Sequence, residues 1–402
     1  MKMGERLQPV DQANRVITLD IIRGFALLGI LLVNMHFFST PKLFTMMAEI
    51  SLFEGTSSQI AEWFITIFAS GKFFTTFSFL FGLGFFLLMS RVEEKGLSVP
   101  RVYSRRMIFL LVIGIIHAFI LWSGDILLPY AIAGLFLMLF RKKAVESIKK
   151  WAIGLFIACM VVLALFSYLN SVLMSILDFD VPLVTTYEEL VAEAMEVYQN
   201  GSFLDILLFR LGEEAPLVLS NLIVMVPLVL SIFLFGLYVG KKGVLRDIPG
   251  HLPWIRKVWS RSLVVGWGLT VIYVILKSEM VILPFHLHLP ATEVLAIVSG
   301  LILSFFYITS LTLLCQKEQW LGRLSFLAPV GQMAFTNYLM QTVIGLLIFN
   351  GYGLGLFGSV PPEYGILITL GIFLFQIIFS KFWLSKFKFG PMEKLWRSFT
   401  YK

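Results

Sequence analysis

The sequence predicts an all-α polytopic membrane protein with about ten transmembrane helices. Of its 402 residues, 58% are hydrophobic and only 14% are charged. Soluble domains carry about 25% charged residues. The apolar residues also gather in repeated runs of about 20, the length that an α-helix needs to cross a bilayer. A bundle of membrane-spanning helices is therefore the expected architecture.

Ten apolar runs are the candidate helices. They cover residues 18–38, 59–90, 105–122, 125–141, 149–174, 216–240, 258–277, 292–315, 325–348 and 363–384. The second run is too long for one straight crossing, and Gly71 and Lys72 interrupt it. We expect a short helix or a re-entrant piece there, followed by a full span.

The basic residues alternate along the chain with the predicted spans. If the N-terminus is cytoplasmic, nearly all of the 32 Lys and Arg residues fall on cytoplasmic segments. Such an excess is typical of cytoplasmic loops, so both termini are predicted to be cytoplasmic. This placement also explains the net charge of +7, so we expect membrane lipids as partners and no nucleic acid.

The chain divides into three parts. Residues 1–145 hold the first four helices and the candidate site, and residues 216–402 form a C-terminal helical domain with a basic tail. Between them, residues 146–215 hold the fifth helix and a long external loop. Apolar residues recur at helical spacing beside acidic ones in this loop, which favours an amphipathic helix on the outer surface. A solvated connector is the alternative.

Charged and polar side chains interrupt the first apolar run. Hydrocarbon tolerates such groups only where they face a protein interior or a wet cavity, so they are candidate functional residues. Asp20 and Arg23 lie one turn apart at the predicted cytoplasmic end, and Asn34 and His36 lie near the other end. Asp20 and Arg23 can pair with each other, and an arginine that faces an inner cavity would bind an anion. These two interpretations are compatible.

The third run begins with a basic cluster and carries a histidine farther along. Arg105 and Arg106 are either ordinary cytoplasmic anchors or anion ligands. His117 follows Arg105 by twelve residues, which places it about 18 Å along the axis and in the outer half of the membrane. A histidine is suited to proton transfer near neutral pH. Asp125, after a very short turn, would either cap the next helix or fold back to orient His117.

The ninth run carries a second polar cluster, in the segment GQMAFTNYLMQT. Asn337 and Gln341 fall broadly on one helical face of this segment. Side chains of this kind often form hydrogen bonds between membrane helices. The alternative is that this face lines a substrate cavity. The two cysteines lie in separate predicted helices and the five histidines are scattered, so we predict neither a disulfide nor a metal site.

Several motifs resemble one group of bacterial membrane proteins. They are LDIIRGFALLGILLVN, FFTTFSFLFGLGF, YSRRMIFLLVIGIIHAFILWSGDILLPYAIAGL, GQMAFTNYLMQTVIGLLIFNGYGLGLFG and FGPMEKLWR. Together they resemble the YeiB-like family, with its C-terminal domain of unknown function. The resemblance covers most of the chain and is weakest across residues 175–215. It implies a multi-pass protein of the bacterial plasma membrane.

The order of the first three motifs is also similar to that of the transmembrane acyltransferase superfamily. That resemblance implies a ten-helix bundle with the first helix at its centre. Members transfer an acyl group from cytoplasmic acyl-CoA to an acceptor on the far side of the membrane. Arg23 matches the arginine of their first-helix motif, and Arg105 and Arg106 match the basic head of the third helix. Sugar O-acetylases place a histidine eleven residues after the motif arginine, where this chain has Asn34.

The first functional hypothesis is therefore an integral-membrane acyltransferase acting on a sugar, lipid or envelope component. Acyl-CoA would bind to Arg23, Arg105 and Arg106 as the donor. His117, oriented by Asp125, would remove the proton from the acceptor.

In the same hypothesis, Asn34, Asn337 and Gln341 would bind carbonyl groups of the substrates. The alternative is a transporter or lipid-handling permease with the same fold, in which His117 would relay protons. A third hypothesis is a scaffold or receptor without catalysis. The oligomeric state stays open, with a homodimer as one candidate.

Overall fold

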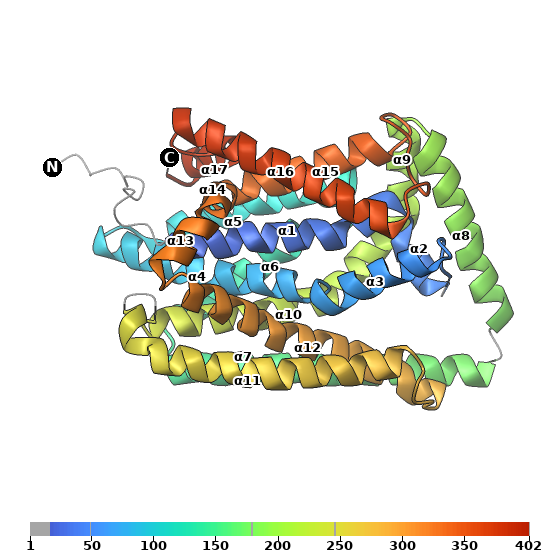
Figure 1. The fold of residues 1–402 in the computed structure, drawn as a ribbon, viewed down its shortest axis with the longest axis horizontal. Helices are drawn as coiled ribbons and strands as arrows, with labels where there is room; N and C mark the ends of the chain where they lie inside the picture. The colour runs from blue at the N-terminus through green and yellow to red at the C-terminus, as the bar shows by residue number, and fades with distance from the viewer. Residues whose placement is uncertain (1–16, 49, 178–179, 245–246, 402) are drawn as a thin grey trace.

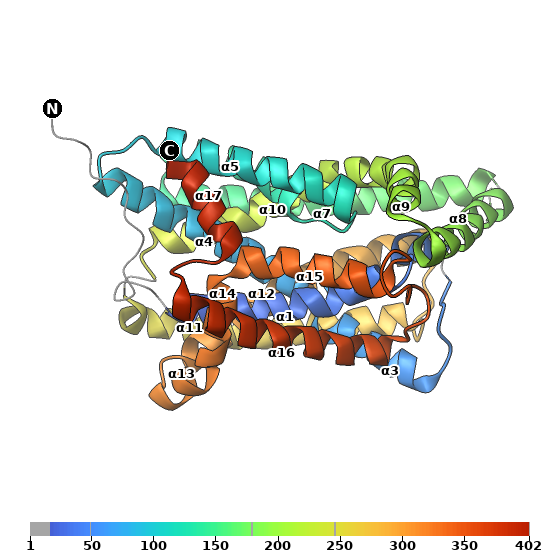
Figure 2. The ribbon, with the colours of Figure 1, turned by 90° about the horizontal axis from the view of Figure 1, so that it is seen from above.

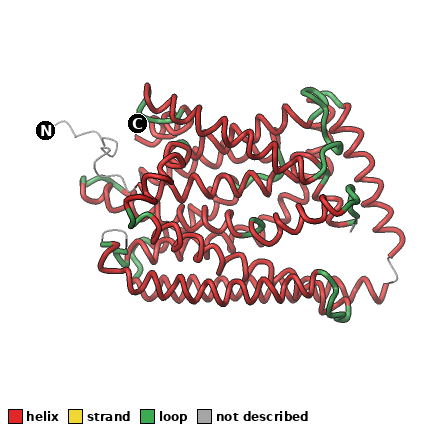
Figure 3. The backbone as a smooth tube through the Cα atoms, viewed as in Figure 1, coloured by secondary structure: helices red, strands yellow, loops and turns green. Residues whose placement is uncertain are grey.

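The computed structural model describes residues 17–48, 50–177, 180–244 and 247–401, and all regular secondary structure in these ranges is helical (Figure 3). In chain order the helices are α1 (Ile17–Ser39), α2 (Lys42–Met47), α3 (Thr56–Phe68), α4 (Lys72–Glu94), α5 (Val99–Ile116), the π-helical segment η2 (His117–Leu121), α6 (Leu127–Leu137), the 3-10 segment η3 (Met138–Phe140), α7 (Val145–Leu177), α8 (Asp180–Asn200) and α9 (Phe203–Phe209). The second half continues with the π-helical segment η4 (Arg210–Glu214), α10 (Ala215–Lys241), α11 (Ile248–Lys277), α12 (Phe285–Leu314), α13 (Glu318–Leu324), the 3-10 segment η5 (Ser325–Leu327), α14 (Ala328–Gln332), α15 (Ala334–Phe349), α16 (Pro362–Lys386) and α17 (Pro391–Tyr401).

The prediction of an all-α membrane protein is confirmed. In the described residues, eight helical stretches are long and apolar enough to cross a bilayer. The ninth predicted run is a pair bent by 75°, because the helix that ends at Gln332 breaks at Met333 before α15 begins. The run predicted at 125–141 is shorter than expected and forms the apolar helix Leu127–Phe140.

The interruption predicted in the second run is a left-handed residue between two helices. Gly71 has a φ of 78° and lies directly before the first residue of α4. A side chain is strained in that backbone region, so glycine permits α3 to end and α4 to begin without a sharp change of direction. The expected short helix followed by a full span is therefore present as α3 and α4.

Helix α1 lies in the interior of the bundle, among the C-terminal helices and α4. It packs against α4, α14, α15 and α16, and Figures 1 and 2 show it surrounded by these elements in both views. The α1–α14 crossing is so close that a Cβ on Gly331 would clash with the carbonyl oxygen of Asp20, and a Cβ on Gly24 would clash with that of Leu327. Small residues allow membrane helices to approach this closely.

The two ends of the bundle differ. We call the end that holds α13 and α17, on the left in Figure 1, the basic end. The described basic segments 91–106, 141–150, 247–261 and 381–397 lie at or near it, whereas Lys2, Arg6 and Arg15 fall outside the described residues.

The opposite end is crossed by α8, which runs at a steep angle to the long helices (Figure 1). Its buried residues Val191, Ala194 and Tyr198 form one stripe, and Glu189, on another face, is exposed. The segment for which an amphipathic helix was predicted therefore contains a helix with one buried stripe, and its place on the outer side of the membrane stays a prediction.

Candidate functional site

A cavity of about 440 Å³ opens at the basic end, between α1, α4, α5, α14, α15 and α17. This volume lies within the usual range for small-molecule pockets, about 300 to 1,000 Å³. Its charged lining residues are Asp20, Arg23, Arg91, Arg106, Glu393 and Arg397. The four arginines outnumber the two carboxylates, so the cavity carries an excess of positive charge that favours an anionic ligand.

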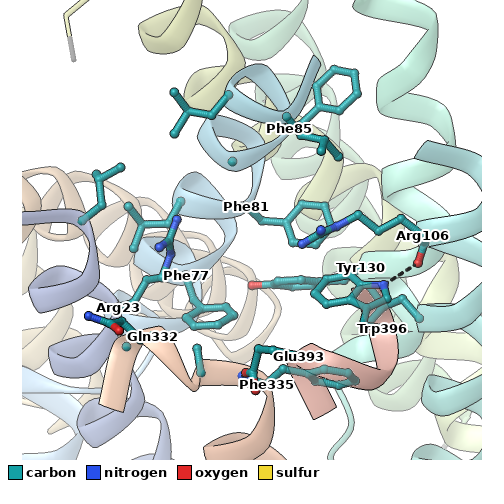
Figure 4. Close-up of a pocket in the computed structure, with 18 of the residues that line it drawn as sticks. Arg23, Phe77, Phe81, Phe85, Arg106, Tyr130, Gln332, Phe335, Glu393 and Trp396 are labelled. Carbon is teal, nitrogen blue, oxygen red and sulfur yellow. Dashed lines mark hydrogen bonds between the residues drawn. The ribbon is translucent and has the colours of Figure 1, made fainter. Parts of the chain in front are cut away.

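The predicted pair on α1 lies in the wall of this cavity. Nη1 of Arg23 donates a hydrogen bond of 2.8 Å to Oδ1 of Asp20. The Asp20 side chain is only 2% exposed, whereas that of Arg23 is 26% exposed and turned into the cavity (Figure 4). The predicted pair is therefore present, and Arg23 also lines the cavity; its role as an anion ligand stays a prediction.

Arg106 lies on the opposite wall from Arg23 (Figure 4). Its guanidinium stacks on the Trp396 ring at 3.6 Å, and Trp396 Nε1 donates to the Arg106 carbonyl oxygen at 2.9 Å. Such a cation–π contact holds the guanidinium plane in place. Arg105, predicted to act with Arg106, is half-buried but does not line the cavity. Successive residues of an α-helix are turned by about 100°, so the two neighbours face different directions.

Aromatic side chains separate the arginines. Phe77, Phe81 and Tyr130 lie between the two basic walls (Figure 4), and the Tyr130 hydroxyl is 2.6 Å from that of Ser78. A pocket with apolar walls and a charged mouth suits an amphiphilic anion. The lining reaches its inner limit at Ile126 and at Tyr338 on α15.

The inner limit of the cavity contacts the predicted His117–Asp125 pair. The rings of Tyr338 and His117 have centroids 5.3 Å apart, and the Ile126 N–H donates to the Tyr338 hydroxyl at 3.3 Å. Nδ1 of His117 lies 2.7 Å from Oδ1 of Asp125, and Nε2 lies 2.9 Å from Oγ1 of Thr342. The His117 side chain is 0% exposed and does not line the cavity itself.

Asp125 caps the next helix and also lies beside His117, the two positions that the sequence left open. Its Oδ2 accepts a hydrogen bond of 2.6 Å from the Leu128 N–H in the first turn of α6, and its Oδ1 faces His117. The histidine is the first residue of the π-helical segment η2, which directly follows α5. Short π-helical segments are frequent at functional sites.

The polar residues predicted on the ninth run lie between helices. Asn337 Nδ2 donates to Ser380 on α16 at 2.9 Å, and Gln341 Nε2 donates to Gln376 at 2.9 Å. Both side chains are buried and neither lines the cavity. These contacts fit the interhelical interpretation and give no support to a role in substrate binding. Asn34 is half-buried on α1 and is also absent from the cavity lining.

Sequence reasoning missed the C-terminal helix α17 as part of the site. Glu393 accepts hydrogen bonds from the N–H groups of Phe335 (2.8 Å) and Thr336 (3.1 Å), in the first turn of α15. Burial raises the pKa of this carboxyl above its ordinary value. Trp396 packs against Phe335 on the same side. The only sequence signal was the motif FGPMEKLWR, whose docking partner is 57 residues away.

A second polar network lies between η2 and η4. Arg210 is 1% exposed, and its Nη1 donates to the Ile120 carbonyl oxygen in η2 at 2.7 Å. The Tyr198 hydroxyl donates to Oε1 of Glu214 at 2.7 Å, and Arg210 Nε lies 3.7 Å from Oε2 of the same carboxylate. The network joins α8, η4 and the segment that carries His117. No residue spacing in the sequence predicts that Arg210 meets Ile120.

Comparisons with known proteins identify relatives over nearly the whole chain. A family model described as "Protein of unknown function (DUF418)" matches residues 239–402. The chain is 35% identical to "Uncharacterized protein YxaH" of Bacillus subtilis, covering 98% of this chain and 96% of the relative. It is 27% identical to "Uncharacterized protein YeiB" of Escherichia coli, covering 96% of each. No solved structure matches. The chain therefore belongs to the YeiB-like family of proteins, whose C-terminal part is the DUF418 domain.

Proposed function

We propose that the protein is an integral-membrane acyltransferase that moves an acyl group from acyl-CoA to an acceptor at the other end of the bundle. One observation carries this proposal: a basic, aromatic-walled cavity is lined by Tyr338, whose ring packs against the buried His117, and His117 lies 2.7 Å from Asp125. A donor bound in this cavity would lie next to a group that can take up a proton.

The chemistry of the cavity suits a coenzyme A thioester. Phosphate groups would bind to the N–H groups of Arg23 and Arg106, since guanidinium matches the geometry of phosphate oxygens. The pantetheine arm would extend along Phe81 and Tyr130 toward Tyr338. The basic end would face the cytoplasm of a bacterial cell, as the excess of Lys and Arg there favours.

His117 would act as the general base. Asp125 faces Nδ1, which orients the ring and leaves Nε2 to accept the proton of an acceptor hydroxyl or amine. The acceptor oxygen or nitrogen would attack the thioester carbonyl, the C–S bond would break, and coenzyme A would leave as the thiolate and then take up the proton.

Ligand titration of the purified protein tests this proposal. Acetyl-CoA and longer acyl-CoAs should raise the melting temperature and appear as bound species in native mass spectrometry. Arg106→Gln should weaken binding by about 10- to 100-fold, because one hydrogen bond to a charged group contributes about 1.5 to 3 kcal/mol. Arg101→Gln is the matched control, since Arg101 is exposed on the same helix and outside the cavity.

A second readout separates binding from chemistry. His117→Gln should bind acyl-CoA as the wild type does but fail to transfer a labelled acetyl group to an envelope lipid and glycan extract. If no acyl-CoA stabilises or binds the wild type, the acyltransferase proposal is wrong.

One observation favours the alternative of a transporter. A second cavity of about 180 Å³, lined by His36, Lys42 and Glu62, lies at the opposite end of α1 from Arg23. Polar cavities at both ends of one helix fit a substrate path that opens alternately to each side. Flux of a solute across proteoliposomes without a covalent product would support this alternative over acyl transfer.

A further inference from the structure

We propose that Thr342 is the nucleophile of a two-step acyl transfer, in which the acyl group is held as an ester on Thr342 before the acceptor receives it. The inference rests on the proposed acyltransferase function and specifies its mechanism. It assigns a catalytic residue that the sequence analysis did not consider.

Thr342, His117 and Asp125 lie in one line of contacts. Thr342 Oγ1 is 2.9 Å from His117 Nε2, and His117 Nδ1 is 2.7 Å from Asp125 Oδ1. Thr342 and His117 are both 0% exposed. A nucleophile within hydrogen-bond reach of a base, and a base oriented by a third group, is the arrangement that activates Ser and Thr hydroxyls in covalent catalysis.

The proton positions follow from the carboxylate. An ionised Asp125 only accepts hydrogen bonds, so it favours the tautomer in which His117 carries its proton on Nδ1. Nε2 then has a free lone pair, and the Thr342 hydroxyl donates to it. In this tautomer the histidine is ready to remove the hydroxyl proton.

The orientation of Thr342 differs from that of three other buried threonines in the long helices. The hydroxyls of Thr76, Thr270 and Thr369 donate to the carbonyl oxygen four residues earlier in their own helices. This bond is the usual way for a threonine to satisfy its hydroxyl inside a membrane helix. The Thr342 hydroxyl instead meets a side chain 225 residues away on another helix.

The cavity ends one helical turn from Thr342. Tyr338 lines the cavity and precedes Thr342 by four residues on α15, so the two side chains lie on the same face about 6 Å apart along the axis. The Tyr338 ring also packs against His117. The burial of Thr342 and His117 would keep water from the ester.

The transfer takes place in two steps. In the first, the Thr342 O–H proton moves to His117 Nε2, the oxygen forms a bond to the thioester carbonyl carbon, and the C–S bond breaks. The coenzyme A thiolate leaves and takes the proton from His117. In the second, an acceptor hydroxyl or amine gives its proton to His117 and attacks the ester carbon. The Thr342 oxygen then leaves and recovers the proton.

The test uses purified full-length protein and acetyl-CoA without any acceptor. The two-step route predicts release of about one coenzyme A per protein and a mass increase of one acetyl group, which peptide mapping should assign to Thr342. Thr342→Ser should keep the reaction because it retains the hydroxyl. Thr342→Val should still bind acetyl-CoA but release coenzyme A on the order of 100-fold more slowly or not at all.

Thr369→Val is the matched control, because Thr369 is also buried and its hydroxyl donates to the Gly365 carbonyl oxygen within α16. This variant should react as the wild type does. If acetyl-CoA binds but no acetyl-protein forms, or if Thr342→Val releases coenzyme A as fast as the wild type, the inference is wrong and the one-step mechanism stands. If acetyl-CoA does not bind at all, the proposed function fails together with the inference.

Discussion

The contact between α17 and α15 offers a prediction whose size can be worked out from the structure. Helix α15 begins after the break at Met333, so its first N–H groups have no carbonyl partners in a preceding turn. Glu393 of α17 accepts from the N–H groups of Phe335 and Thr336, at 2.8 and 3.1 Å, and from the Thr336 hydroxyl at 2.6 Å. One carboxylate therefore caps α15 and attaches α17 to it.

Glu393→Ala should release α17 from the cavity wall. Loss of a helix cap costs about 0.5 to 2 kcal/mol. Since three hydrogen bonds share one group, we expect about 2 to 3 kcal/mol for the local contact. This free energy corresponds to about a 30- to 150-fold increase in local opening.

Hydrogen exchange measures that opening directly. In Glu393→Ala the amides of Phe335 and Thr336, and those of residues 391–401, should exchange faster by about this factor. Glu393→Gln retains one acceptor oxygen and should give a smaller effect. Glu318→Ala is the control, because Glu318 is exposed in the first turn of α13 at the same end of the bundle. Unchanged exchange in Glu393→Ala would refute the assignment of this carboxyl as the cap.

Three further predictions concern stability. Burial raises the pKa of Glu393, so the stability that this carboxyl contributes is present below its ordinary pKa of about 4.3 and is lost as pH rises through the raised value. The melting-temperature difference between wild type and Glu393→Gln should therefore shrink as the pH rises from about 4 toward neutral and above, and a constant difference would contradict this. Gly331→Ala should lower stability by about 1 to 3 kcal/mol in chemical denaturation, because its Cβ would meet a backbone carbonyl of α1, whereas Gly322→Ala, which has open space, should not. Arg210→Met should lower the free energy of unfolding by about 3 to 5 kcal/mol, because it removes the hydrogen bond to the Ile120 carbonyl oxygen and leaves the buried Glu214 carboxylate without its arginine. A decrease below about 1 kcal/mol would show that the network does not stabilise the fold.

The sequence was sufficient for the elements that depend on local patterns. Apolar run lengths located the membrane helices, and helical spacing located α8. The short turn before Asp125 allowed its position beside His117 to be predicted, because two helices joined by a short turn pack as antiparallel neighbours.

Other features depend on helix rotation and on distant pairing, which a local pattern does not contain. Arg106 faces the cavity and Arg105 does not, because packing against Trp396 sets the rotation of α5. Thr342 contacts His117 only because α15 packs beside η2. The two residues are 225 positions apart, so no local sequence pattern predicts their contact. The amides of the ninth run could be assigned to interhelical bonds only once α16 was in place.

A structure determined with a non-hydrolysable thioether analogue of acetyl-CoA tests the central claim most directly. The account predicts that the phosphates lie within hydrogen-bond distance of Arg23 and Arg106, and that the acyl end reaches Tyr338 beside His117. An analogue bound outside this cavity, or with its acyl end directed away from Tyr338, would contradict the assignment of the cavity as the donor site.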